Sequence, residues 1–184
     1  MSSPDNRVRS YTRYPLSSIL IYNGTTILHF LLGGIGIILG YGNWVGYLLG
    51  TLYLVFAFLE MYLHMPLKVC PNCVYYRLDN SLCISSLNVV SRKIAREGDI
   101  KNFSNRAKGF FCPNNLYIAS LVIPIIAIIP ALVLDFSFAV LAILLVLVGL
   151  LVFRFFVIFP RIACVHCRAK NVCPQAQSMG FGEK

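Results

Sequence analysis

The feature that most constrains the fold is a long apolar run in the second half of the chain. Residues 116–159 are 44 positions in which only Asp135 and Arg154 are charged. As a single helix this run would measure about 66 Å, roughly twice the hydrocarbon thickness of a bilayer. It must therefore fold back, and the polar break at residues 135–137 is the expected turn. The sequence predicts a transmembrane hairpin over residues 116–159.

Another hairpin, the first along the chain, is predicted at residues 17–63. It consists of two apolar segments, residues 17–41 and 44–63, joined by a short turn with aromatic residues at interface height. Hydrophobic residues make up 58% of the 184-residue chain and charged residues only 12%, which is unlike a soluble domain. We therefore expect an all-α integral membrane protein built as a four-helix transmembrane bundle, with the lipid bilayer as a partner.

The polar segments are a basic N-terminal arm (residues 1–16), a loop (64–115) and a tail (160–184). Four spans place all three on one side of the bilayer, and 15 of the 16 Lys and Arg residues lie there. The exception is Arg154, inside the last span. The positive-inside rule makes the crowded side cytoplasmic. We therefore expect a multi-pass cell-membrane protein with both termini in the cytoplasm.

The loop also carries an amphipathic pattern. Apolar and basic residues alternate there at helical spacing, which predicts a short helix on the membrane surface: Leu87, Val90, Ile94, Arg92, Lys93 and Arg96. Phe103, Phe110 and Phe111 fit the same interfacial setting. No nucleic-acid motif is present, so we expect this surface to lie on anionic lipid and not to bind nucleic acid.

One frame of residues occurs in both halves of the chain. Residues 66–73 and 160–167 each read Pro, three residues, Cys, two residues, Cys, with an offset of 94 positions. An even number of spans between the copies predicts a parallel repeat, with two hairpins related by an axis near the membrane normal. We expect each proline to end a helix and the second and fourth spans to be neighbours. Both cysteine pairs would then emerge at the same height on the cytoplasmic side.

The cysteines are the candidate metal ligands. Two Cys-x2-Cys elements can supply four thiolates to one tetrahedral metal. The plainer interpretation is that they are apolar fillers or lipidation sites, but crowded thiols without a metal would be liable to oxidation. The candidate ligands are Cys70, Cys73, Cys83, Cys112, Cys164, Cys167 and Cys173.

Two arrangements of these ligands are open. In the first, the two Cys-x2-Cys pairs share one metal. In the second, the loop cysteines, including Cys83 and Cys112, form one site. The tail cysteines, including Cys173, then form another, with His166 or an open position as the fourth ligand.

The metal is predicted to be either zinc or an iron–sulfur cluster. Zinc would clamp the two hairpins together, whereas iron would make the site an electron carrier. Seven cysteines exceed what one zinc needs. A cluster at the cytoplasmic face could also exchange electrons with a soluble protein on one side and a lipid-soluble quinone on the other.

Two ionisable residues occupy equivalent positions within the spans. Glu60 and Arg154 each lie ten residues before the first cysteine of a pair. Intramembrane ionisable groups are candidates for function, here a proton or quinone site. A structural ion pair that orients the second and fourth spans is the favoured interpretation. His29, near the middle of the first span, is expected to be buried and hydrogen-bonded.

These observations predict a membrane-embedded subunit that carries a cysteine-ligated metal centre at the cytoplasmic face. It would be an electron-transfer or anchor component of a larger membrane complex, with membrane or cytoplasmic protein subunits as partners. One alternative is a zinc-stapled scaffold or regulatory protein. Another is a membrane thiol oxidoreductase, although such enzymes present their cysteines to the oxidising side. No catalytic triad, phosphate-binding loop or carboxylate pair is present in the sequence.

Overall fold

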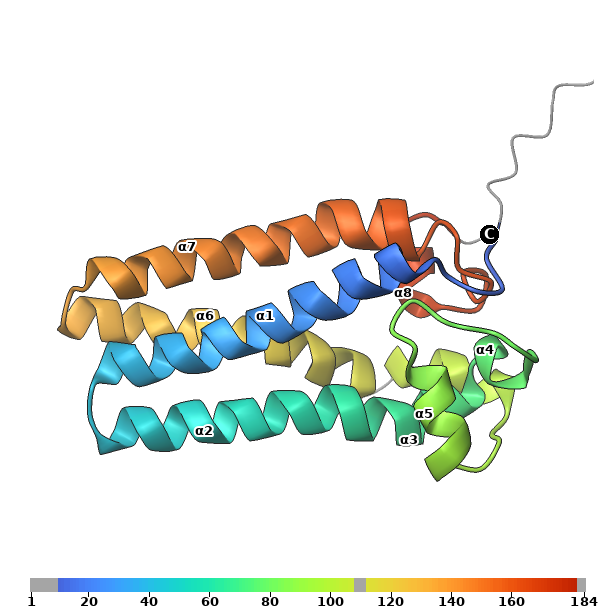
Figure 1. The fold of residues 1–184 in the computed structure, drawn as a ribbon, viewed down its shortest axis with the longest axis horizontal. Coiled ribbons are helices and arrows are strands. Elements are labelled where there is room, and N and C mark those ends of the chain that lie inside the picture. The colour runs from blue at the N-terminus through green and yellow to red at the C-terminus, as the bar shows by residue number, and fades with distance from the viewer. Residues whose placement is uncertain (1–9, 108–111, 182–184) are drawn as a thin grey trace, which may run out of the picture.

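Four long helices run side by side in a bundle, in the order expected of two hairpins (Figure 1). The structure is a computed structural model and describes residues 10–107 and 112–181. The long helices are Leu16–Tyr41 (α1), Trp44–Leu59 (α2), Pro113–Leu134 (α6) and Phe138–Phe153 (α7). With the helical turns that extend α2 and α7, all four are long and apolar enough to cross a membrane. The chain is therefore an all-helical, multi-pass membrane protein.

The two turns at the far end of the bundle lie where the sequence placed them. Gly42 follows α1 in the left-handed conformation, with φ +60°. Asn43 then caps α2 by accepting a 3.1 Å hydrogen bond from the amide of Gly46. In the second hairpin, α6 ends at Leu134 and α7 begins at Phe138. Both turns are short, so each pair of helices must be antiparallel.

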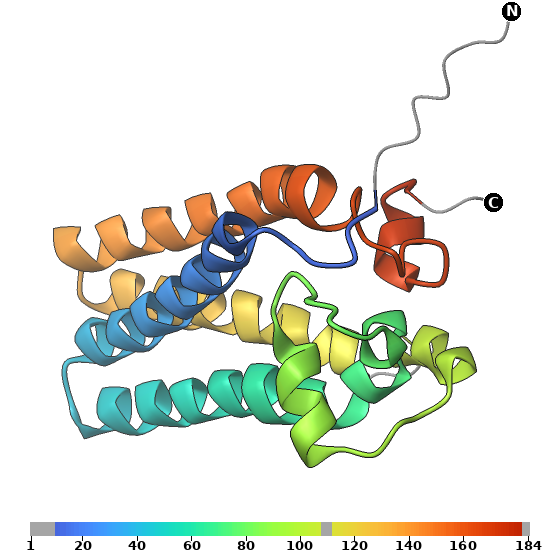
Figure 2. The same ribbon diagram turned by 45° about the vertical axis from the view of Figure 1, so that its right-hand side comes forward.

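The helix neighbours differ from those expected. α1 packs on α2, α6 and α7, and α6 also packs on α2 and α7. Both views show α2 and α7 at opposite edges of the bundle, with α1 and α6 between them (Figures 1 and 2). Gly50 lets α2 approach α1 closely, since a Cβ there would lie 2.9 Å from the carbonyl oxygen of Gly34. The second and fourth spans are thus separated by the central helices.

Both outer helices continue as π-helices at the polar end of the bundle. α2 continues into a π-helix at Glu60–His64 (η1) and a short α-helix at Met65–Lys68 (α3). α7 continues into a π-helix at Arg154–Ala163 (η4). Each π-helix begins at the ionisable residue of its repeat copy.

The two frame prolines do not end these helices, which corrects the sequence prediction. Pro66 lies in α3 and Pro160 lies inside η4. A proline cannot donate to the carbonyl four residues earlier and its ring collides with that carbonyl. The wider π-turn moves the carbonyl aside, and the 2.7 Å bond from the Cys164 amide to the Phe159 carbonyl has this wider spacing. Helical backbone therefore extends to Lys68 and Ala163, close to the cysteines.

The polar segments gather at one end of the bundle (Figure 2). The loop forms η2 (Cys70–Asn72), α4 (Val74–Arg77), α5 (Leu87–Ile94) and η3 (Ile100–Ala107). The tail forms α8 (Pro174–Ser178). The strap, which we define as residues 10–15, runs between the loop and the tail.

The amphipathic helix is present as α5, but its residues are used differently from the prediction. Val90 and Ile94 are exposed, as a membrane-surface helix requires. Arg92 instead turns inward and donates to main-chain carbonyls of α4. Phe103 is buried against the tail and is not interfacial. Phe110 and Phe111 lie outside the described residues.

Candidate metal centre

A pocket at the polar end of the bundle is lined by six of the seven cysteines. Its cavity volume is about 180 Å³. The other lining residues are mostly apolar or aromatic, among them Met61, Val69 and Phe159. The cysteines come from both halves of the chain: Cys70, Cys73, Cys83, Cys164, Cys167 and Cys173. The structure thus brings together residues more than 90 positions apart in the sequence.

The two Cys-x2-Cys pairs close the same kind of turn. The amide of Cys73 donates to the carbonyl of Cys70 at 3.0 Å, and the amide of Cys167 donates to that of Cys164 at 3.2 Å. Each turn directly follows the helical extension of a membrane span. The repeated letters of the sequence therefore correspond to a repeated local structure.

The loop side of the pocket is held by hydrogen bonds within the loop. The Arg92 guanidinium donates to the carbonyls of Tyr75, Tyr76 and Leu78 and to the hydroxyl of Ser81. The Asn88 side chain accepts from the amide of Cys83 at 3.1 Å and donates to the Ser81 carbonyl at 3.0 Å. These bonds fix the backbone around Cys83 from inside the same segment.

The tail side of the pocket packs on an apolar cluster that joins the tail to the loop. Its buried members are Val69, Phe103, Ala169, Cys173 and Ala176, and Cys73, Cys164 and Cys167 pack against them. Four cysteines therefore share one apolar environment.

The strap ties the tail to the loop. The amide of Tyr11 donates to the carbonyl of His166 at 2.9 Å, and the amide of Tyr14 donates to that of Leu82 at 2.9 Å. The Tyr14 hydroxyl donates to the Ala163 carbonyl at 2.5 Å. The Tyr75 hydroxyl, from the loop, donates to the Tyr11 carbonyl at 2.6 Å.

Tyr14 and Tyr75 both line the pocket and are almost completely buried. Burial, followed by the neighbouring Cys167 thiol, raises the pKa of both hydroxyls above their ordinary value. They therefore act as neutral hydrogen-bond donors. The sequence did not identify either tyrosine as a pocket residue, because tyrosines beside an apolar run are more typical of a membrane interface.

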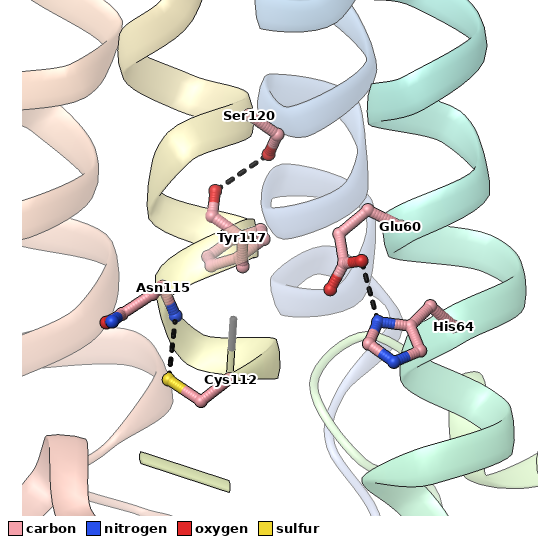
Figure 3. A network of polar contacts seen from close by, with 6 residues as sticks. All are labelled: Glu60, His64, Cys112, Asn115, Tyr117 and Ser120. Atoms are coloured by element: carbon pink, nitrogen blue, oxygen red, sulfur yellow. Dashed lines mark hydrogen bonds and ion pairs between the residues drawn. The ribbon is translucent and has the colours of Figure 1, made fainter. Parts of the chain in front are cut away.

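Two candidate ligands take other positions. Cys112 lies outside the pocket lining, at the start of α6, where its sulfur accepts from the amide of Asn115 at 3.4 Å (Figure 3). The imidazole of His166 stacks on the ring of Tyr11, with ring centroids 4.5 Å apart. Neither residue is placed as a lining group of the cysteine pocket.

The pocket does not present a finished coordination shell. Within residues 10–107 and 112–181, no group of three or more Cys, His, Asp or Glu side chains is set in metal-binding geometry. The cysteines share a cavity without converging on one point, so their metal ligation stays a prediction.

Glu60 and Arg154 have separate partners. The Glu60 carboxylate accepts from His64 Nδ1 at 2.7 Å on its own helix (Figure 3), and its other oxygen, Oε1, is buried without a hydrogen bond. Arg154 donates to hydroxyls of α1 and α6, including Thr26 at 2.6 Å and Tyr117. The expected direct ion pair is not formed among the described residues, because α1 and α6 lie between the two outer helices.

His29 follows the prediction. It is buried in α1, and its Nε2 lies 2.9 Å from the carbonyl oxygen of Leu121 on α6. It therefore joins two central helices and is not directed at the cysteines. No family model, no curated protein and no solved structure matches this chain.

Proposed function

We propose that the chain is a membrane-embedded subunit that holds a cysteine-ligated metal centre at the polar end of its bundle. In this role it is an electron-transfer or anchor component of a larger membrane complex. The observation that carries the proposal is the shared pocket, which six cysteines from the loop and the tail line. The charge bias assigns this end to the cytoplasm, where stable disulfides are rare and thiols are available to a metal.

The arrangement favours one shared site over two separate ones. Cys70, Cys73, Cys164 and Cys167 would supply the four thiolates, from two turns of the same form. Cys83 and Cys173 also line the pocket and would extend the ligand set of a larger centre. A complete site from the loop alone would need Cys112, which instead caps α6. The matched turns and matched π-helices also support the parallel repeat of two hairpins.

The size of the cavity favours an iron–sulfur cluster over a single zinc ion. Four sulfurs about 2.3 Å from one zinc leave almost no space between them. The cavity here is about 180 Å³, and an engineered cavity of about 150 Å³ takes up a benzene molecule. There is room for a group of several atoms. Such a cluster, once bound, supplies reversible one-electron transfer.

The residues around the cavity have defined roles in this proposal. Apolar side chains and Tyr14 of the strap line the cavity and would limit the access of water to a bound centre. The polar end would face a soluble electron-donor protein. The bundle would face a membrane acceptor in the complex, for which a lipid-soluble quinone is the candidate. Two successive one-electron transfers, with two protons from water, would reduce one quinone to its quinol.

The proposal is tested by metal and sulfide analysis of protein purified without oxygen, together with its absorption spectrum. We expect iron and acid-labile sulfide with a broad visible absorption. The double variant Cys164→Ser/Cys167→Ser should lose the metal, because it removes half of the shared thiolates. Cys112→Ser is the matched control, and it should keep the metal because serine can still cap α6.

Other outcomes have a defined meaning. Colourless protein with stoichiometric zinc, lost in the same double variant, would replace the electron carrier by a zinc-stapled scaffold. Wild-type protein that contains no metal and whose cysteines titrate as exchangeable dithiols would contradict the proposal and favour the thiol oxidoreductase.

A further inference from the structure

Among the described residues, Arg154 is a buried cation without a carboxylate partner. Its side chain is only 1% exposed, inside the helical segment that leads from α7 to the tail. Arginine stays protonated in proteins, so the charge cannot be removed by proton loss. Among the residues that the structure describes, the ion pairs of the acidic side chains involve His64 and Arg77, not Arg154. An unbalanced charge at this depth is costly and indicates a function.

Neutral groups surround the guanidinium. It donates to the hydroxyls of Thr25, Thr26 and Tyr117. Its central carbon lies 5.2 Å from the ring centroid of Tyr22 and 5.9 Å from that of Tyr117. Hydroxyls and aromatic faces satisfy hydrogen bonds and stabilise a cation. They do not supply the opposite unit charge.

The same two tyrosines form part of the wall of the cysteine pocket. Tyr22 from α1 and Tyr117 from α6 both line the cavity, and their hydroxyl oxygens lie 3.4 Å apart. Arg154 contacts both rings and is not itself among the residues that line the cavity. The cation therefore adjoins two side chains of the cavity wall.

We propose that Arg154 is the counter-charge of an anionic, thiolate-ligated centre in this pocket. The inference rests on the proposed function, and it adds a residue that sets the affinity and the potential of the site. Four thiolates carry four negative charges, so a metal ion or cluster core of charge +2 leaves the centre with a net charge of −2. Because Arg154 is buried, its attraction for such a centre is only weakly screened by water. Because reduction adds negative charge, the same cation favours the reduced form and raises the reduction potential.

A purely structural role for Arg154 makes a different prediction. If Arg154 only connects α1, α6 and η4 through hydrogen bonds, it needs hydrogen-bond donors, and its removal changes only the stability of the fold. A counter-charge changes the affinity for the metal and the reduction potential, with the positive charge itself as the decisive property. Glutamine keeps donors without the charge, whereas lysine keeps the charge without the planar fork.

The test compares Arg154→Gln with Arg154→Lys in the full chain in detergent. One measurement is cobalt(II) titration of the metal-free protein, followed by thiolate-to-cobalt absorption. The other is the reduction potential of anaerobically purified protein. Arg154→Gln should bind cobalt about tenfold more weakly, and its potential should fall by about 59 mV, the one-electron equivalent of tenfold. Arg154→Lys should stay close to wild type in both measurements.

Lys93→Gln is the matched control. It removes one positive charge from an exposed position of α5 at the same end of the molecule, where water and salt screen it. Lys93→Gln should change neither the cobalt affinity nor the reduction potential.

The inference is overturned if folded Arg154→Gln keeps the wild-type cobalt affinity and potential. If Arg154→Gln does not fold, Arg154→Met combined with Thr26→Val removes the charge and a buried hydroxyl together, and it must show the same losses. Wild-type protein that binds neither cobalt nor iron would instead overturn the proposed function, and with it this inference.

Discussion

The two cysteine-bearing segments leave the membrane in the same way but are held in place differently. Each begins with a π-helix, a proline and a Cys-x2-Cys turn. The loop is then fixed by bonds among its own residues, centred on Arg92 and Asn88. The tail has short-range bonds within its own turns, such as the 2.7 Å bond from Gln177 Nε2 to the Asn171 carbonyl. Its contacts with other segments are made by the strap and by the apolar cluster it shares with the loop.

This difference indicates that one half of the pocket is built locally and the other half is docked onto it. A segment with its own hydrogen-bond network opens only when that network breaks. A docked segment opens when its contacts with other segments are lost. We therefore expect the tail cysteines to become accessible more easily than the loop cysteines.

The largest effect should come from removing the centre of the loop network. Arg92→Ala leaves main-chain carbonyls of α4 and the Ser81 hydroxyl without their donor. Hydrogen bonds to a charged group are worth about 1.5–3 kcal/mol each, so the loss should reach about 3 kcal/mol locally. Hydrogen exchange should rise across residues 70–94. Lys93→Ala, on the exposed side of the same helix, is the control, and equal exchange in both variants would contradict the locally built half.

A smaller effect, confined to the tail, should follow from Tyr14→Phe. The change removes the bond to the Ala163 carbonyl, at a cost of about 1–2 kcal/mol. The tail cysteines should be alkylated faster while the loop keeps its hydrogen exchange. Tyr47→Phe, at an exposed site in α2, should have no effect. Equal loosening of loop and tail would show that the strap does not act on the tail selectively.

Tyr14 also gives the tail a pH dependence. Burial raises the pKa of its hydroxyl above the ordinary value of 10. A raised folded-state pKa means that the contribution to stability is complete below pH 10 and is lost as the pH rises above it. Unfolding measured between pH 8 and pH 11 should show this loss in wild type, and the part due to Tyr14 should be absent from Tyr14→Phe. If stability fell equally with pH in wild type and in Tyr14→Phe, the assignment of this loss to the Tyr14 hydroxyl would be contradicted.

The smallest effect is expected from Glu60, in the π-helix that precedes the loop. Glu60→Gln keeps an acceptor for His64 and should change stability by about 1 kcal/mol or less. Because Glu60 and Arg154 do not share a contact, Glu60→Gln and Arg154→Gln should be additive within about 0.5 kcal/mol. Denaturant unfolding of the two single variants and the double variant measures this. A coupling well above that value, or rescue by exchanging the two charges, would restore the direct ion pair.

Much of the bundle could be predicted because it depends on the length and apolarity of consecutive residues. The run at 116–159 is too long for one span, so a turn near Asp135 was required. The first hairpin followed from the same argument. The helix at Leu87–Ile94 followed from its periodicity, although the inward direction of Arg92 did not.

The candidate site was predictable in part for the same reason. Matched spacing after two spans indicated that Cys70, Cys73, Cys164 and Cys167 belong to one end of the bundle. Spacing carries no information about which helices are neighbours, so the pairing of Glu60 with Arg154 was wrong in detail. The strap could not be predicted, because its contacts join residues about 70 and 155 positions apart.

By itself, the sequence determined four spans, the turns between them and the end at which the cysteines emerge. These follow from local hydrophobicity, which acts on consecutive residues. The tertiary structure decided that α1 and α6 separate the outer helices, that Cys112 lies apart and that Arg154 contacts Tyr22 and Tyr117, which line the cysteine pocket. Such contacts depend on close packing among distant residues, and that packing exists only in the folded chain.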